Sequence, residues 1–284
     1  MTSPRLNIGQ ISYLNVLPLF QTLKHHFPPS DDIRYIQGHP AEMNAGLLDG
    51  SIDLSPGSAF EYLAHAERYR LLPGLSITAP AGPVKSVLLV SPVALEDIPQ
   101  WMADNGPQIH VTKASASSVA LLKTLWHFHW QFPQADWTAI DAGTGHTMDR
   151  PFLEIGNYAL RHWLRPPEGW HIIDLANEWR EFTGLPFVFA VWMVRNGLSE
   201  EQLDLLADVH TALVKCKLSC HEAIGEIAEM DDICTWISRD GIEDYLSTLD
   251  YELGPKEQAS LTLFADYCRR LGLIPGAPGL RWAL

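Results

Sequence analysis

The chain has 284 residues, of which 46% are hydrophobic and 19% charged, and these fractions exclude a largely disordered protein. Acidic residues outnumber basic ones by 34 to 20, which gives a formal net charge of −14 with neutral histidines. A surface of that sign repels nucleic-acid phosphates and anionic lipids, so we expect no nucleic-acid partner and no membrane partner. The length is sufficient for two domains, each with a core of its own.

The first half of the chain alternates short apolar runs with segments of helical periodicity. We expect strands at 5–12, 33–38, 51–55, 69–74, 75–79 and 84–91, with helices at 16–27, 40–50 and 57–69 between them. A second block repeats the alternation, with strands at 108–112, 153–156, 171–175 and 187–194 and helices at 115–130, 157–164 and 176–184. Residues 198–284 are predicted to be nearly all helical, beginning with a capping box from Ser199 to Gln202.

These elements predict an α/β protein of two lobes. The chain would leave the first lobe near Val90 and return near Phe187, which divides it into lobe 1 (1–90 plus 188–284) and lobe 2 (91–187). Two crossover segments would join the lobes, and the helical C-terminal part would pack on the first. Ligands in open α/β sheets lie beyond the carboxyl ends of the strands, so we expect a substrate cleft between the lobes.

The N-terminal segment and the cysteines indicate a cellular compartment. Residues 1–15 contain no basic cluster followed by a long apolar run, so we expect no signal peptide. The cysteines are bunched in the last quarter of the chain, unlike a disulfide framework: Cys216, Cys220, Cys234 and Cys268. Together these features predict a reduced, cytoplasmic protein.

Small polar residues follow several of the predicted strands. They are Asn15, Ser58, Ser86, Thr112, Ser115, Ser117, Ser118, Gly156 and Asn157. Free N–H groups at helix N-termini, together with such hydroxyls, can hold a carboxylate without a lysine. Ordinary helix capping explains any single one of these residues equally well, and only convergence of both lobes on one cleft would favour a ligand.

Other candidate chemistry is weaker. Asp53 lies inside a predicted strand, where we expect it to bond to backbone, and Glu61 lies in the first turn of a helix, where a negative charge suits the dipole. The scattered histidines, including His127 and His129, have no partners at metal-ligand spacing, and neither do Cys216 and Cys220. We therefore expect no metal and no cofactor.

Three segments occur in a distinctive order along the chain: Tyr13-Leu14-Asn15, the run from Val84 to Val87, and the segment from Trp179 to Trp192. Their ordered combination resembles the chorismate dehydratase family of the futalosine route to menaquinone. The resemblance implies a type II periplasmic-binding-protein fold, a cytoplasmic enzyme without cofactor or metal, and loss of water from chorismate to give 3-[(1-carboxyvinyl)oxy]benzoate. It also implies substrate contacts at Asn15 and at the junction residues named above.

The sequence departs from the family pattern at two places. Ala59 stands where the family usually has a second serine, and Asn157 stands where it usually has an aspartate. These departures keep two alternatives open, a 1,4-dihydroxy-6-naphthoate synthase-like enzyme and a non-catalytic carboxylate-binding or sensor protein. For the dehydratase we expect Asn15 to orient the substrate, because a neutral amide is no base at pH 7. The base would be the substrate's own side-chain carboxylate or, in competition, Glu61.

Overall fold

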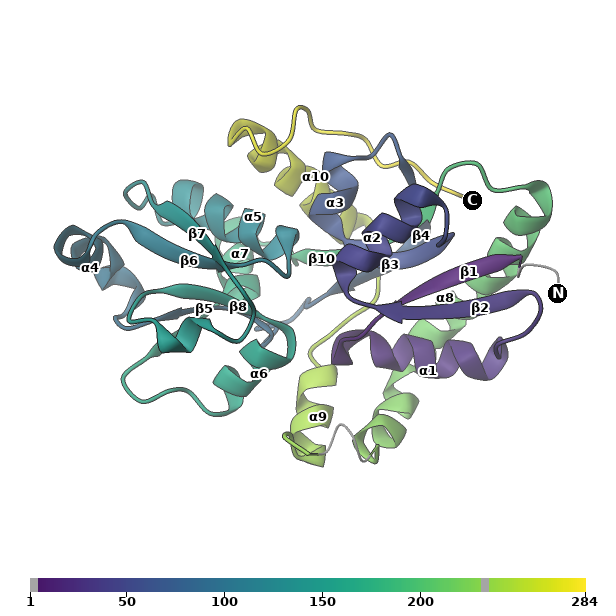
Figure 1. The fold of residues 1–284 in the computed structure, drawn as a ribbon, viewed down its shortest axis with the longest axis horizontal. Helices are drawn as coiled ribbons and strands as arrows, with labels where there is room; N and C mark the ends of the chain where they lie inside the picture. Colours follow the sequence, from purple (N-terminus) through teal and green to yellow (C-terminus); the bar gives the residue numbers. More distant parts are fainter. Residues whose placement is uncertain (1–4, 231–234) are drawn as a thin grey trace.

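The computed structural model describes residues 5–230 and 235–284, which form two lobes, each built on its own sheet (Figure 1). Helices cover the sheets, so the α/β prediction with two mixed sheets is confirmed. Cys234 lies outside the described residues. Figure 1 shows the lobe with β5–β8 on the left and the lobe with β1–β4 on the right, with α10 above and α9 below them.

The first sheet has the order β2-β1-β3-β10-β4 within the described residues. β1 pairs in parallel with β2 and β3, whereas β10 runs antiparallel to both β3 and β4. The strands are β1 (Leu6–Ile11), β2 (Ile33–Gly38), β3 (Leu54–Ser58), β4 (Tyr69–Thr78) and β10 (Val188–Arg195). β4 merges the two extended pieces that the sequence predicted at 69–74 and 75–79, because Pro73 and Gly74 are accommodated within one continuous strand.

The second sheet has the order β7-β6-β8-β5-β9 in the part of the chain that the structure describes. β6 pairs in parallel with β7 and β8, and β5 runs antiparallel to β8 and β9. The strands are β5 (Val87–Ser91), β6 (Gln108–Thr112), β7 (Asp136–Ile140), β8 (Phe152–Ile155) and β9 (His171–Asp174). The boundary expected after residue 90 falls inside β5, so the chain changes sheets earlier, between Thr78 and Val87. β10 belongs to the first sheet, so the chain is back in that sheet from Val188.

Helices lie on the faces of both sheets and form most of the C-terminal part. Their bounds are α1 (Leu17–His26), α2 (Pro40–Asp49), α3 (Ala59–Ala64), α4 (Ile98–Asn105), α5 (Ala116–Thr124), α6 (Gly156–Leu164), α7 (Leu175–Thr183), α8 (Glu200–Ala228), α9 (Arg239–Leu246) and α10 (Pro255–Arg270). The helix predicted over 115–130 is α5 followed by a π-helical turn at Leu125–His129. α8 packs on α1, and α10 contacts α3 and α5.

The first crossover is held by a buried carboxylate. Asp174, at the start of α7, accepts hydrogen bonds from the backbone N–H groups of Val84 and Lys85 in the crossover, at 3.2 and 2.7 Å, and caps its own helix through Ala176 and Asn177. Lys85 has a left-handed backbone with φ +63°, and its amine pairs with Asp244 at 2.7 Å. The crossover is therefore fixed both to lobe 2, through Asp174, and to α9, through Asp244.

Candidate functional site

A cavity of about 230 Å³ lies where the carboxyl ends of β1 and β3 in the first sheet face those of β6 and β8 in the second. Six of the predicted contact residues line it, drawn from both lobes and from the crossover: Asn15, Ser58, Ser86, Ser115, Ser118 and Gly156. The convergence that separates a ligand site from ordinary helix capping is therefore present. Ile11, Ile77, Phe189 and other apolar side chains complete the wall.

Two residues of the lobe 1 wall have side-chain carbonyl oxygens without a hydrogen-bond partner among the described residues. They are Oδ1 of Asn15, in the turn after β1, and Oδ1 of Asn44, on α2, and both atoms are buried. Burial of an unpaired polar atom is costly, so each oxygen is suited to accept a hydrogen bond from a ligand. Sequence reasoning missed Asn44, although a polar residue next to the buried Met43 on an otherwise apolar helix face was the available signal.

Support for Asn15 comes from the far end of the chain. The hydroxyl of Tyr251 donates to the backbone carbonyl of Asn15 at 2.9 Å, and Tyr251 is itself buried. Burial raises the pKa of Tyr251 well above its ordinary value, so the hydroxyl stays protonated and remains a donor. The position of Asn15 in the cavity wall thus depends on the segment that follows α9.

Ser86 and Gly156 meet at the crossover. The N–H of Gly156 donates to the carbonyl of Ser86 at 2.8 Å, and the Ser86 Oγ accepts from the buried Tyr245 hydroxyl at 3.0 Å. Burial also raises the pKa of Tyr245, to about 12. Gly156 has φ +60°, a left-handed conformation that favours glycine, and a Cβ there would lie 3.5 Å from the Tyr13 ring.

The lobe 2 wall is built around the start of α5. Ser115 caps this helix by accepting from the N–H of Ser118 at 3.2 Å, and the two hydroxyls lie 2.9 Å apart. The positive end of the α5 dipole therefore faces the cavity. Lys113, directly after β6, also lines the cavity, and sequence reasoning did not select it. Its amine pairs with Asp141 at 2.9 Å.

Three predicted contacts do not line the cavity. Thr112 accepts from the N–H of Ala114 and borders a second hollow, which Lys113, Ser115 and Phe60 also line. The Ser117 Oγ bonds instead to the Ser58 Oγ at 2.7 Å and accepts from the N–H of Phe60 at 2.9 Å, which joins α5 to the first lobe. Asn157 is half-buried on α6, one residue beyond the lining Gly156. For these three, position after a strand did not determine the direction of the side chain.

Asp53 and Glu61, the two candidate carboxylates of the sequence analysis, have partners away from the cavity. Asp53 accepts from the backbone N–H of Asn7 at 2.7 Å, as predicted, and also pairs with Arg195 at 2.7 Å. Glu61 accepts from the Tyr69 hydroxyl at 3.2 Å and is not among the lining residues. Ala59, the first departure from the family pattern, is buried and does not line the cavity either.

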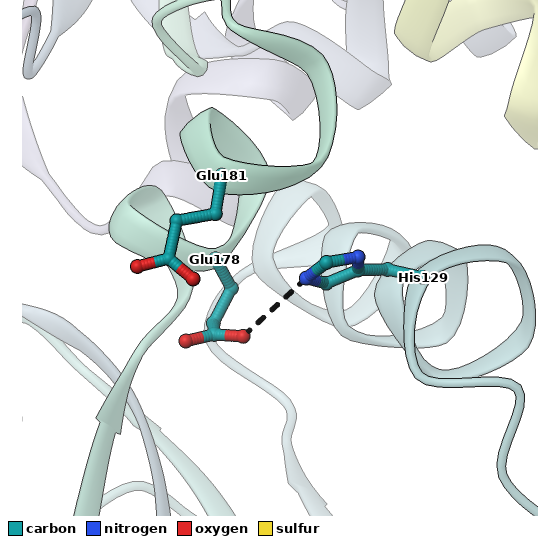
Figure 2. Close-up of side chains that lie close together, drawn as sticks. All are labelled: His129, Glu178 and Glu181. Carbon is teal, nitrogen blue, oxygen red and sulfur yellow. Dashed lines mark ion pairs between the residues drawn. The ribbon is translucent and has the colours of Figure 1, made fainter.

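Among the described residues, one group of possible metal ligands lies away from the cavity, where α7 packs on the π-helical turn after α5. His129, Glu178 and Glu181 offer ligand atoms within 4.8 Å of one another, and Figure 2 shows the His129 ring directed at Glu178. The histidine nitrogen is 3.7 Å from the Glu178 carboxylate, which also accepts from the Trp130 Nε1–H at 2.8 Å. Sequence spacing could not reveal this group, since α7 follows His129 by more than 40 residues. Its contacts hold α7 against the π-helical turn.

Of the residues that the structure describes, none belongs to a helix with the length and apolar character needed to cross a bilayer. Cys216, Cys220 and Cys268 are free thiols, and all three are buried.

Comparison with solved structures shows the fold. A crystal structure of a protein from Archaeoglobus fulgidus aligns with a TM-score of 0.73 and 15% identity, covering 95% of this chain and 98% of that one. The aliphatic sulphonate binding protein SsuA of Escherichia coli aligns with a TM-score of 0.65 and 16% identity, covering 97% of this chain and 90% of that one. These likenesses confirm the predicted periplasmic-binding-protein-like fold.

Sequence comparison shows the family. A chorismate dehydratase of Thermus thermophilus is 31% identical over 301 aligned positions, covering 95% of this chain and 96% of that protein. A chorismate dehydratase of Campylobacter jejuni is 31% identical over 185 positions, 64% of each chain. The sequence model described as menaquinone biosynthesis matches residues 6–270. The chain therefore belongs to the menaquinone biosynthesis family.

Proposed function

We propose that this protein is a chorismate dehydratase, a carbon–oxygen lyase that converts chorismate to 3-[(1-carboxyvinyl)oxy]benzoate in the cytoplasm. The observation that carries the proposal is the convergence of Asn15, Ser86, Ser115 and Gly156 on one cavity in a member of the menaquinone biosynthesis family. Chorismate is a compact dianion with one hydroxyl. A wall of hydroxyls, helix N–H groups and amide oxygens offers both donors for its carboxylates and acceptors for its hydroxyl.

The reaction is an elimination across two ring carbons. The C–H bond breaks at the carbon that carries the ether, the proton passes to a base, and its electron pair becomes a ring double bond. The C–O bond at the neighbouring carbon breaks, and the departing hydroxyl takes up the proton that the base removed, so that water leaves and the base is regenerated. Aromatisation drives the reaction, so the protein needs chiefly to orient the ring, the hydroxyl and the base.

Asn15 is the residue that we assign to the reacting centre. Its buried Oδ1 accepts from the substrate hydroxyl before the reaction and so fixes that hydroxyl relative to the ring, while the proton that lets the hydroxyl leave comes from the protonated base. The base is the side-chain carboxylate of the substrate, folded over the ring. The position of Glu61 supports this choice, because its carboxylate contacts Tyr69 and lies outside the cavity wall.

The two alternatives from the sequence carry less support. A 1,4-dihydroxy-6-naphthoate synthase-like enzyme would use a histidine base, and among the described residues no histidine lines the cavity. A sensor protein would keep the cavity and lack turnover.

Incubation of the purified protein with chorismate tests the proposal directly. Ultraviolet spectra and mass analysis should show a new aromatic product that is lighter by one water, formed at a rate proportional to protein concentration. The Asn15→Ala variant serves as the matched control for contaminating activity. Chorismate recovered unchanged from the wild-type protein would refute the dehydratase and leave the sensor.

A further inference from the structure

We propose that Lys113 binds the ring carboxylate of chorismate and exchanges its present partner, Asp141, for the substrate. This inference rests on the proposed function and names the contact that selects a ring acid. Lys113 is the single charged side chain among the described residues that line the cavity. Hydroxyls and helix N–H groups supply only partial charges, whereas the ligand carries two full negative charges into a protein of net charge −14.

The backbone of Lys113 is fixed while its amine is free to move. Its N–H donates to the carbonyl of Ile140 at 3.0 Å, which continues the parallel pairing of β6 with β7. Lys113 and Asp141 are therefore the residues that directly follow two neighbouring strands at the same edge of the sheet. Their side chains are 59% and 76% exposed.

An ion pair that is exposed to this degree contributes little to stability, because water and salt screen it. Exchange of Asp141 for a carboxylate inside the cavity moves the same amine to a site that Ser115 and the start of α5 also line. Screening there is weaker, so the new pair is the stronger one. The present pair thus keeps Lys113 at the edge of the cavity without holding it back from a ligand.

The mechanism decides which carboxylate Lys113 takes. An ammonium group next to a carboxylate lowers the pKa of that carboxylate and makes it a poorer base. If the side-chain carboxylate is to remove the ring proton, it must stay free of Lys113. The ring carboxylate is then the partner, and the side-chain carboxylate lies toward Asn15 in lobe 1.

Two half-ligands separate the carboxylates. One is 3-methoxybenzoate, which keeps the ring acid alone, and the other is 2-phenoxyacrylate, which is the product without its ring acid. In calorimetric titrations Lys113→Met should weaken the binding of 3-methoxybenzoate about tenfold. The same variant should change the affinity for 2-phenoxyacrylate by less than about twofold. Lys113→Arg should restore most of the affinity, and Asp141→Asn should strengthen 3-methoxybenzoate a few-fold by removing the competing acid.

Lys123→Met is the matched control, since it removes the same charge from the same lobe. The Lys123 amine lies 5.5 Å from the centre of the Trp137 ring. Lys123 borders the second hollow, as Lys113 also does, but unlike Lys113 it does not line the cavity. We expect it to leave both half-ligands unchanged. The proposal for Lys113 is wrong if Lys113→Met weakens the two half-ligands equally or weakens neither.

Turnover distinguishes failure of this inference from failure of the proposed function. For chorismate, Lys113→Met should raise KM about tenfold and leave kcat nearly unchanged, because the contact is the same in the ground state and the transition state. If the wild-type protein turns over chorismate and Lys113→Met has an unchanged KM, only the proposal for Lys113 is wrong. If the wild-type protein shows no turnover but binds 3-methoxybenzoate through Lys113, the dehydratase proposal is wrong and the ring-acid site stands.

Discussion

The two walls of the cavity differ in what they offer a ligand. Lobe 1 contributes Asn15 and Asn44 with unpaired carbonyl oxygens, while lobe 2 contributes the start of α5, two hydroxyls and Lys113. The lobe 1 wall offers neutral amide and hydroxyl groups, whereas the lobe 2 wall adds the N-terminus of α5 and the positive charge of Lys113. The comparison indicates a division of labour, in which lobe 2 holds the ring carboxylate of the ligand and lobe 1 orients its hydroxyl.

The largest expected effect is at the lobe 1 wall. Asn15→Ala removes the oxygen that we assign to the departing hydroxyl and should lower kcat about a hundredfold or more, by analogy with the loss of one positioned group in other active sites. Steady-state kinetics with chorismate measure it. Asn7→Ala is the matched control, because Asn7 also has a buried unpaired Oδ1 but lies in β1 outside the cavity wall, and its kcat should be preserved.

Glu61→Gln tests whether Glu61, which competes with the substrate carboxylate, is the base. It should retain turnover, since the Glu61 carboxylate lies outside the cavity. A loss of several thousandfold in a folded Glu61→Gln variant would instead make Glu61 the base and contradict the substrate-carboxylate mechanism.

The second expected effect is a pH dependence of stability that arises from Asp174 beside the first crossover. Burial raises the pKa of Asp174 from 3.8 to about 6, although backbone N–H groups oppose the shift. The folded state therefore favours the protonated acid, and the contribution of Asp174 to stability is greatest below about pH 4 and is lost as the pH rises through 6. Relative to Asp174→Asn, the wild-type protein should lose about 2 kcal/mol of unfolding free energy between pH 4 and pH 7.

Denaturant unfolding of both proteins across that range measures the difference, and contributions from other groups cancel. A difference that stays constant with pH would show that Asp174 keeps its ordinary pKa in the folded protein.

The smallest expected effects come from two tyrosines of the C-terminal part, each of which supports one wall of the cavity. Tyr251→Phe removes the hydrogen bond to the Asn15 carbonyl, and Tyr245→Phe removes the one to Ser86. Each should cost about 1 kcal/mol of stability. Since Asn15 belongs to the reacting wall, Tyr251→Phe should lower kcat about fivefold, whereas Tyr245→Phe should act mainly on KM. Equal changes of kcat in both variants would contradict the division between the walls.

Much of the fold was predictable because hydrophobic periodicity is local. The strands of the first sheet and the return at β10 follow from runs of adjacent residues, and so do the capped starts of α5 and α8. The sequence analysis did not identify β7, whose residues Asp136–Ile140 are mostly half-exposed at a sheet edge and give a weak apolar signal. β5 was assigned to the wrong lobe, since a buried run does not reveal which sheet it joins.

The site was predictable where a strand end fixes the side chain and not where a distant contact does. Gly156 directly follows β8, and Ser115 caps α5 three residues after β6, so both lie at strand-to-helix junctions that a local pattern reveals. Asn44 lies within a helix, and the Tyr251 partner of Asn15 is 236 residues away in the chain, so neither is visible in a local pattern. Lys113 was passed over because a lysine after a strand usually faces solvent, and only the fold places it at a cavity.

The Ser58–Ser117 bond has a consequence for how small molecules enter and leave. It links the two lobes beside the cavity, and separation of the lobes at this point would exchange the Ser58–Ser117 and Phe60 N–H hydrogen bonds for bonds to water, at a net cost of about 1 kcal/mol each. The opposite margin, where the Lys113 side chain is exposed, carries no such cost beyond a screened ion pair. Small molecules are therefore expected to enter and leave at that margin more readily than past the two serines.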